Sequence, residues 1–109
     1  MAEPAEHLLV WVTHPDATGA EELARALVRE GLAACVNIQG RVMSVYRWQG
    51  REETGQETLL LIKTRAGRYA ALESAIRASH PYDLPEIIAT PITRGLPEYL
   101  AWIDETTHD

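Results

Sequence analysis

The distribution of apolar residues predicts a strand, a helix and a second strand in the first third of the chain. Residues 8–13, LLVWVT, form a continuous apolar run rich in β-branched and aromatic types, which is typical of a strand buried on both faces. After it, apolar side chains recur at the spacing of an amphipathic helix. Thr18 and Glu21 predict a capping box at the start of this helix, and Gly31 predicts its end. A second apolar run, residues 33–38, predicts the next strand.

The middle of the chain predicts a long hairpin. A bend or bulge is expected at Gln39-Gly40, and residues 41–48, RVMSVYRW, then alternate in the manner of a strand. Neither face of this segment is purely apolar, so we do not expect helices to cover it. The polar segment 49–56, QGREETGQ, predicts a loop, and the apolar run at 57–64 predicts the returning strand.

The last third predicts a helix, a strand and a short terminal helix. Residues 66–79 carry a partial apolar stripe at helical spacing. Residues 86–92, EIIATPI, are typical of a strand in which Pro91 marks either the end or an edge of the sheet. Residues 96–103 have helical apolar spacing, and Pro97 suits the first turn of that helix.

This order of elements predicts an α+β fold. The sequence β-α-β-β-α-β is that of the ferredoxin-like split βαβ sandwich, here followed by a C-terminal helix. The length fits one domain, residues 1–109, in which we expect 1–6 and 106–109 to fray. Both long helices should cover one face of an antiparallel sheet. The other face is apolar and has nothing in the chain to cover it, so we expect self-association.

The composition excludes several classes of protein. A formal net charge of −6, with scattered basic residues, argues against nucleic-acid binding. The longest apolar stretch, 8–12, is too short to cross a membrane. The single cysteine, Cys35, excludes an internal disulfide and a CxxC metal pair. The N-terminus shows no signal peptide, so we expect a cytoplasmic location.

Several motifs together resemble one family. LAACVNI, SVYRWQG, LLLIKT, HPYDLPEIIATPI and YLAWI occur in this order between residues 8 and 103. This set resembles the CutA, or divalent-cation tolerance, family. The resemblance implies a homotrimer of ferredoxin-like subunits, joined through the long hairpin arms in a layout similar to that of the PII signalling proteins. It also implies a role in tolerance to divalent metals, copper in particular, by binding rather than catalysis.

Two histidines are the candidate metal ligands that the resemblance suggests. Some members carry a cysteine in the first strand at the position of Val12 here, so a copper site based on that thiol is in doubt. The following turn supplies His14, and the string SHPY supplies His80. Imidazole is a good ligand for copper and other divalent cations. The alternative is that both are exposed turn histidines that precede prolines.

A second hypothesis is a cleft between subunits that binds a small anion or zwitterion. Lys63 follows four apolar residues, and Glu86 opens the last strand, so the two side chains either pair or reach water separately. The predicted aromatic walls are Tyr46, Trp48 and Tyr82, which otherwise serve as interface packing. Cys35 is either a small core residue or part of the interface or cleft.

No motif in the chain predicts an enzyme. GxSxG, HExxH and phosphate-binding glycine loops are all missing from the sequence. We therefore predict a homotrimeric protein of divalent-cation tolerance that binds copper or a related ion. The alternative is a PII-like signalling or scaffold trimer with a small metabolite in its inter-subunit clefts.

Overall fold

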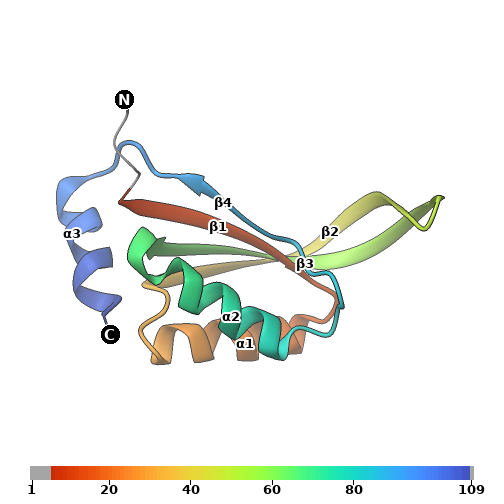
Figure 1. Ribbon diagram of the computed structural model, residues 1–109, viewed down its shortest axis with the longest axis horizontal. Helices are drawn as coiled ribbons and strands as arrows, with labels where there is room; N and C mark the ends of the chain where they lie inside the picture. The colour runs from red at the N-terminus through yellow and green to blue at the C-terminus, as the bar shows by residue number, and fades with distance from the viewer. Residues whose placement is uncertain (1–5, 109) are drawn as a thin grey trace.

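The computed structural model, which describes residues 6–108, has the predicted split βαβ architecture (Figure 1). Eight elements follow one another in this order: β1 (His7–His14), α1 (Ala17–Arg29), β2 (Cys35–Trp48), β3 (Arg51–Arg65), the 3₁₀ turn η1 (Ala66–Arg68), α2 (Tyr69–Ser79), β4 (Ile87–Pro91) and α3 (Pro97–Thr106). The predicted fold class is therefore confirmed.

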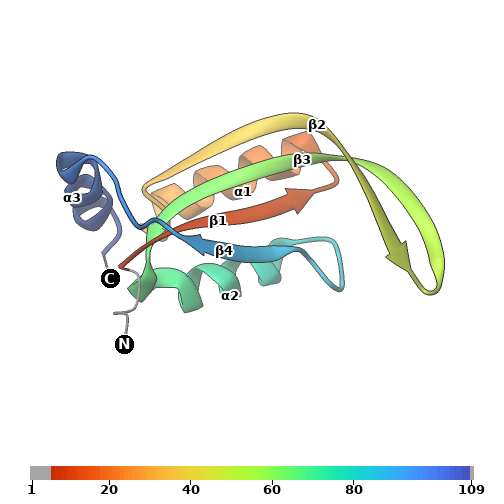
Figure 2. The same ribbon diagram turned by 90° about the horizontal axis from the view of Figure 1, so that it is seen from above.

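The four strands form one antiparallel sheet in the order β2-β3-β1-β4. Helices α1 and α2 lie side by side against one face of this sheet, and α3 lies at one end (Figures 1 and 2). The core between the sheet and the two helices consists mainly of fully buried aliphatic side chains, among them Val10, Val12, Leu27, Leu60, Ile62, Leu72 and Ile76. The short strand β4 is an edge, as Pro91 predicted.

The N-cap of helix α1 lies two residues before the predicted cap, Thr18. It is Asp16, whose carboxylate accepts a hydrogen bond of 2.8 Å from the backbone N–H of Gly19. The prediction of Thr18 as the cap was wrong because Asp16 offers a better acceptor one turn before Gly19. Gly31 does end the helix, with a φ of 72° and the paired backbone hydrogen bonds of a Schellman motif.

The predicted polar loop at 49–56 is instead mostly strand. Trp48 pairs with Arg51, and the turn between them has φ values of 51° at Gln49 and 79° at Gly50. Positive φ at both positions is the signature of a type I′ hairpin turn, whose twist lets two long strands stay paired up to the tip. The polar residues beyond it belong to β3, because this part of the hairpin is exposed and needs no apolar face.

The hairpin extends well beyond the rest of the sheet, as Figure 2 shows. β1 pairs with β3 only as far as Thr58, so the distal part of β3 is paired with β2 alone. A register shift between Gln39 and Val42, with Arg41 at a φ of 62°, confirms the predicted bulge. We call the segment from Val42 to Glu57 the hairpin arm.

Described residues near both ends of the chain make contacts with the rest of the fold. The carbonyl of Glu6 accepts a hydrogen bond of 2.8 Å from Ala66 N–H. Thr106 belongs to α3, and Thr107 is fully buried with its hydroxyl 2.6 Å from the carbonyl oxygen of Ile103. Residues 1–5 and 109 lie outside the described residues.

The face of the sheet opposite α1 and α2 is largely uncovered, as expected. It carries apolar side chains that are partly or largely exposed, including Leu9, Trp11, Leu61 and Ile88. Among residues 6–108, no helix has the length and hydrophobicity needed to span a membrane.

Candidate functional site

Folding brings the two candidate metal ligands together beneath one end of the sheet. His14 is the last residue of β1, and His80 directly follows α2, where Pro81 disfavours a further helical residue. Their ring centroids are 4.9 Å apart, and the ring of Tyr82 lies 5.0 Å from that of His80. Both histidines are buried, so the expectation that they are exposed turn residues was wrong.

Three of the four ring nitrogens in this pair are engaged in hydrogen bonds to the backbone. His14 Nδ1 accepts from Asp16 N–H at 3.0 Å, and His80 Nδ1 accepts from Tyr82 N–H at 3.1 Å. His80 Nε2 lies 2.7 Å from the carbonyl oxygen of Thr13 and donates its proton there. These contacts assign a neutral imidazole to each residue, with the proton on Nε2 in His80.

The electrostatic surroundings of His14 favour its neutral state. Burial lowers the pKa of His14, and the adjacent His80 lowers it further, whereas Asp16 opposes both effects. The packing of His14 also depends on Gly19, which leaves room for its ring. A Cβ at that position would lie 2.6 Å from His14 Cε1. The pair therefore joins the end of β1, the start of α1 and the connector after α2.

The pair does not make a metal centre by itself. Within residues 6–108, no group of three His, Cys, Asp or Glu side chains is placed to hold an ion. His80 has no ring nitrogen free for a metal unless it gives up a buried backbone hydrogen bond. His14 and His80 thus fit a structural role within one subunit, and a metal would need further donors from elsewhere.

Tyr82 links the connector to the base of the hairpin arm. Its hydroxyl donates to Glu57 on β3 at 3.2 Å. Burial raises the pKa of Tyr82, and the Glu57 carboxylate and Tyr46 add to this effect. Both Tyr82 and Tyr46 remain exposed in the single subunit.

The structure does not pair Lys63 with Glu86, which was one of the two alternatives that the sequence left open. Lys63 pairs with Leu9 across the β3–β1 ladder, whereas Ile87, which follows Glu86, pairs with Val12. The two side chains are therefore separated by β1 and by about 13 Å along the strand direction. Sequence alone could not reveal this, because the register between strands depends on the whole sheet.

Lys63 instead faces Cys35, its direct partner on β2. Lys63 Nζ is 4.0 Å from Cys35 Sγ, and both residues are partly buried on the uncovered face. Tyr99 of α3, which was not a predicted site residue, lies near Cys35. Burial raises the pKa of Tyr99, and the nearby thiol raises it further. We call Cys35, Lys63 and Tyr99 the thiol cluster.

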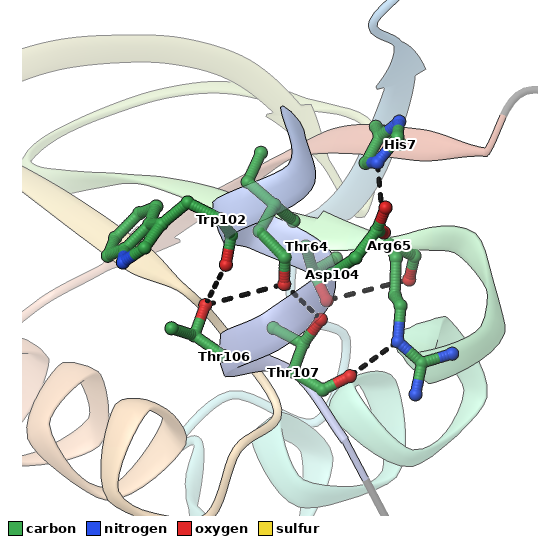
Figure 3. A network of polar contacts seen from close by, with 8 residues as sticks. His7, Thr64, Arg65, Trp102, Asp104, Thr106 and Thr107 are labelled. Carbon is green, nitrogen blue, oxygen red and sulfur yellow. Dashed lines mark hydrogen bonds and ion pairs between the residues drawn. The ribbon is translucent and has the colours of Figure 1, made fainter. Parts of the chain in front are cut away.

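A polar network fixes α3, and with it Tyr99, against the end of the sheet (Figure 3). His7 Nε2 lies 3.0 Å from Asp104 Oδ1, joining the first strand to the last helix. Arg65 Nε donates to the carbonyl oxygen of Thr107, and Ile103 of α3 is fully buried. No local motif marks His7 or Asp104, because their contact depends on how α3 docks.

The remaining predicted cleft residue, Trp48, lies at the far end of the molecule. It pairs with Arg51 at the tip of the arm, so roughly 40 Å of strand separates it from the level of Lys63. Tyr46 is only two residues closer to the sheet. One subunit therefore cannot place both Lys63 and the aromatic residues of the arm around a single ligand.

The fold and its elements define a small α+β protein of the split βαβ class with a projecting hairpin. The sequence pattern of the CutA1 divalent ion tolerance protein family matches residues 8–106. The chain belongs to this family, which confirms the resemblance noted in the sequence.

Individual relatives agree with this assignment. The chain is 48% identical over 99 residues to the divalent-cation tolerance protein CutA of Thermus thermophilus, covering 91% of this chain and 96% of that protein. It is 43% identical over 102 residues to the chloroplastic protein CutA of Arabidopsis thaliana, covering 94% of this chain. It spans only 56% of the length of the Arabidopsis relative.

Solved structures show the same fold. The CutA1 structure from Shewanella sp. SIB1 superposes with a TM-score of 0.95 at 40% identity, covering 98% of this chain and 100% of that chain. The Thermus thermophilus structure gives a TM-score of 0.92 at 46% identity, covering 94% and 99% of the two chains.

Proposed function

We propose that this protein acts in divalent-cation tolerance as a homotrimer, by binding an ion rather than by catalysis, and in the cytoplasm. The observation that carries the proposal is the uncovered apolar surface of the sheet and arm. Monomeric proteins seldom leave such a surface exposed, and a partner subunit is the simplest cover for it.

The hairpin arm supports self-association most directly. Met43 is 69% exposed, and Val45, Tyr46 and Trp48 are also exposed large side chains on the same two-stranded segment. Full burial of an aliphatic side chain of this size contributes about 1.5–3 kcal/mol. An isolated two-stranded ribbon is marginally stable in water, so packing of the arm on a neighbouring subunit would stabilise it as well.

The proposed cation site lies between subunits. The divalent ion, copper being the first candidate, needs more donors than His14 and His80 offer within one subunit. Acidic residues on the exposed arm, Glu52 and Glu53, are available to a neighbour and suit a hard divalent ion. The proposal therefore predicts that metal binding depends on assembly.

Sedimentation tests the assembly. We expect the wild-type protein to sediment as a trimer at micromolar concentration and Trp48→Glu to dissociate, because a carboxylate would be buried in the contact. Arg51→Glu, which changes an exposed neighbour at the same tip, is the matched control and should remain a trimer. A stable wild-type monomer at micromolar concentration would refute the homotrimer.

Calorimetric titration with Cu²⁺ and Zn²⁺ tests the ion. Micromolar binding by the trimer, weakened at least tenfold in the dissociated Trp48→Glu protein, would support an inter-subunit site. His80→Ala should be compared in the same experiment, because equal binding in both proteins removes His80 from the ligands. Millimolar-weak binding by the assembled wild type contradicts the metal proposal.

A second candidate function is a signalling or scaffold trimer of the PII type that binds a small anionic metabolite. It is favoured by the position of Lys63, a cation among apolar side chains on the uncovered face. Arms from a neighbour would have to supply the aromatic walls. Lys63→Ala should abolish metabolite binding and leave metal binding nearly intact, whereas Lys63→Arg should retain part of the metabolite affinity.

A further inference from the structure

The thiol cluster combines a nucleophilic sulfur and a primary amine at contact distance. Cys35 and Lys63 are directly opposed on antiparallel strands, with Nζ and Sγ 4.0 Å apart. Ala34 N–H donates to the Lys63 carbonyl oxygen at 2.9 Å, and the Thr64 hydroxyl donates to the Leu32 carbonyl oxygen at 2.8 Å. Both bonds lie on one side of the pair, and the ladder continues on its other side at Val36 and Ile62, so the register keeps the sulfur and the amine opposed.

The side chain of Lys63 is not committed to a carboxylate. The ion pairs formed within residues 6–108 are His7–Asp104 and Glu21–Arg25, and the predicted partner Glu86 lies on the far side of β1. Its neighbours on β3, Ile62 and Thr64, are fully buried on the opposite face. The amine therefore has the Cys35 sulfur, and no carboxylate, as its polar neighbour in the described structure.

Tyr99 adds a phenol near the sulfur. The helix that carries it is held by the contacts of His7 with Asp104 and of Arg65 with Thr107 (Figure 3). These tertiary contacts keep the phenol in this part of the molecule.

We propose that Cys35 and Lys63 form an oxidant-triggered cross-link, a redox modification site on the uncovered face of the sheet. Hydrogen peroxide is the oxidant: the Cys35 thiolate attacks one peroxide oxygen, giving the sulfenic acid, and the other oxygen leaves as water after protonation. The neutral Lys63 amine then attacks the sulfur, and the S–O bond breaks. The products are an S–N sulfenamide and a second water, whose proton Tyr99 is placed to supply.

This reaction is balanced. One thiol, one amine and one peroxide give one sulfenamide and two waters, so the protein loses two hydrogens in a two-electron oxidation. A sulfenic acid commonly condenses with a second thiol or a nearby nitrogen. The chain has one cysteine, so no second thiol exists within a subunit, and Lys63 Nζ is the side-chain nitrogen placed opposite Cys35.

Intact mass spectrometry of the full-length protein tests the cross-link. After stoichiometric hydrogen peroxide and alkylation of the remaining thiol, we expect a species about 2 Da lighter than the reduced protein, which dithiothreitol returns to the starting mass. Peptide mapping should join the segments that contain residues 35 and 63. A wild type that shows only added oxygen, or only a disulfide between two subunits, would overturn the proposal.

Two variants test the nucleophilic amine of Lys63 apart from its charge and apart from the phenol of Tyr99. Lys63→Arg retains the positive charge but lacks a nucleophilic amine, so the lighter species should disappear and oxygen adducts of Cys35 should replace it. Tyr99→Phe should lower the initial cross-linking rate several-fold. The same products in wild type and Lys63→Arg would contradict the assignment of Lys63.

A measurement on the wild type alone tests the cross-link without relying on variants that could misfold. Reductive methylation should modify Lys63 in the reduced protein and spare it after peroxide treatment, because its nitrogen is then bonded to sulfur. Equal methylation of Lys63 before and after oxidation would overturn the proposal without recourse to any substitution.

Discussion

Two polar clusters at different places on the sheet have opposite character. The histidine pair of His14 and His80 is buried, and three of its four ring nitrogens are hydrogen-bonded to the backbone. The thiol cluster is only partly buried, and its Lys63–Cys35 contact is long and weak. The comparison teaches that the residues with the chemistry most typical of a metal site are the ones most committed to structure here.

The largest expected effect comes from breaking the histidine pair. His80→Ala removes a buried ring and leaves the Thr13 carbonyl and the Tyr82 N–H without partners, so the free energy of unfolding should fall by about 2–4 kcal/mol. Urea unfolding at a fixed protein concentration measures it. The exposed His108→Ala is the control and should change stability by less than about 0.5 kcal/mol. A loss below about 0.5 kcal/mol in His80→Ala would show that the pair does not stabilise the fold.

A substitution that crowds the His14 ring is a second test of the histidine pair. Gly19→Ala would place a methyl group 2.6 Å from Cε1 of the buried His14 ring, at an expected cost of about 1–3 kcal/mol. Gly55→Ala is the matched control, because a Cβ there meets nothing within 4 Å. Thermal unfolding of the two variants side by side gives the difference. Equal melting temperatures would mean that His14 moves aside at no cost.

Acid should destabilise the fold through the histidine pair. The pKa of His14 is lowered in the folded state, so the unfolded chain binds the proton more readily below the ordinary value of 6.5. Stability should therefore be full above pH 6.5 and fall as the pH drops from there through the lowered folded pKa. His14→Asn should reduce this slope in unfolding measured between pH 7.5 and 5. An unchanged slope would assign it to other groups.

The smallest effect is expected at the anchor of α3. Asp104 is 53% exposed at its side chain, so Asp104→Asn should cost no more than about 1 kcal/mol. Hydrogen exchange should nevertheless accelerate in α3, because the contact with His7 joins that helix to β1. Glu105→Gln, on the exposed side of the same helix, should leave exchange unaltered. If both variants exchange alike, the contact does not hold the helix.

Most of the fold follows from the hydrophobic pattern, and the errors have local causes. The polar segment 49–56 was predicted as a loop because an exposed strand has no apolar face to reveal it. Thr18 was chosen as a cap by its spacing to Glu21, although Asp16 held the better position. The site was less predictable, because the sequence left pairing of Lys63 with Glu86 open, whereas the sheet places Lys63 opposite Cys35.

The sequence by itself determined the order of strands and helices, the long hairpin and membership of the CutA1 family, because these depend on residue spacing along the chain. Tertiary structure alone decided the contacts between distant residues. The β3–β1–β4 register separated Lys63 from Glu86, and the docking of α3 placed Tyr99 beside Cys35. Such contacts are set by the packing of the whole sheet, which the spacing of residues along one strand does not encode.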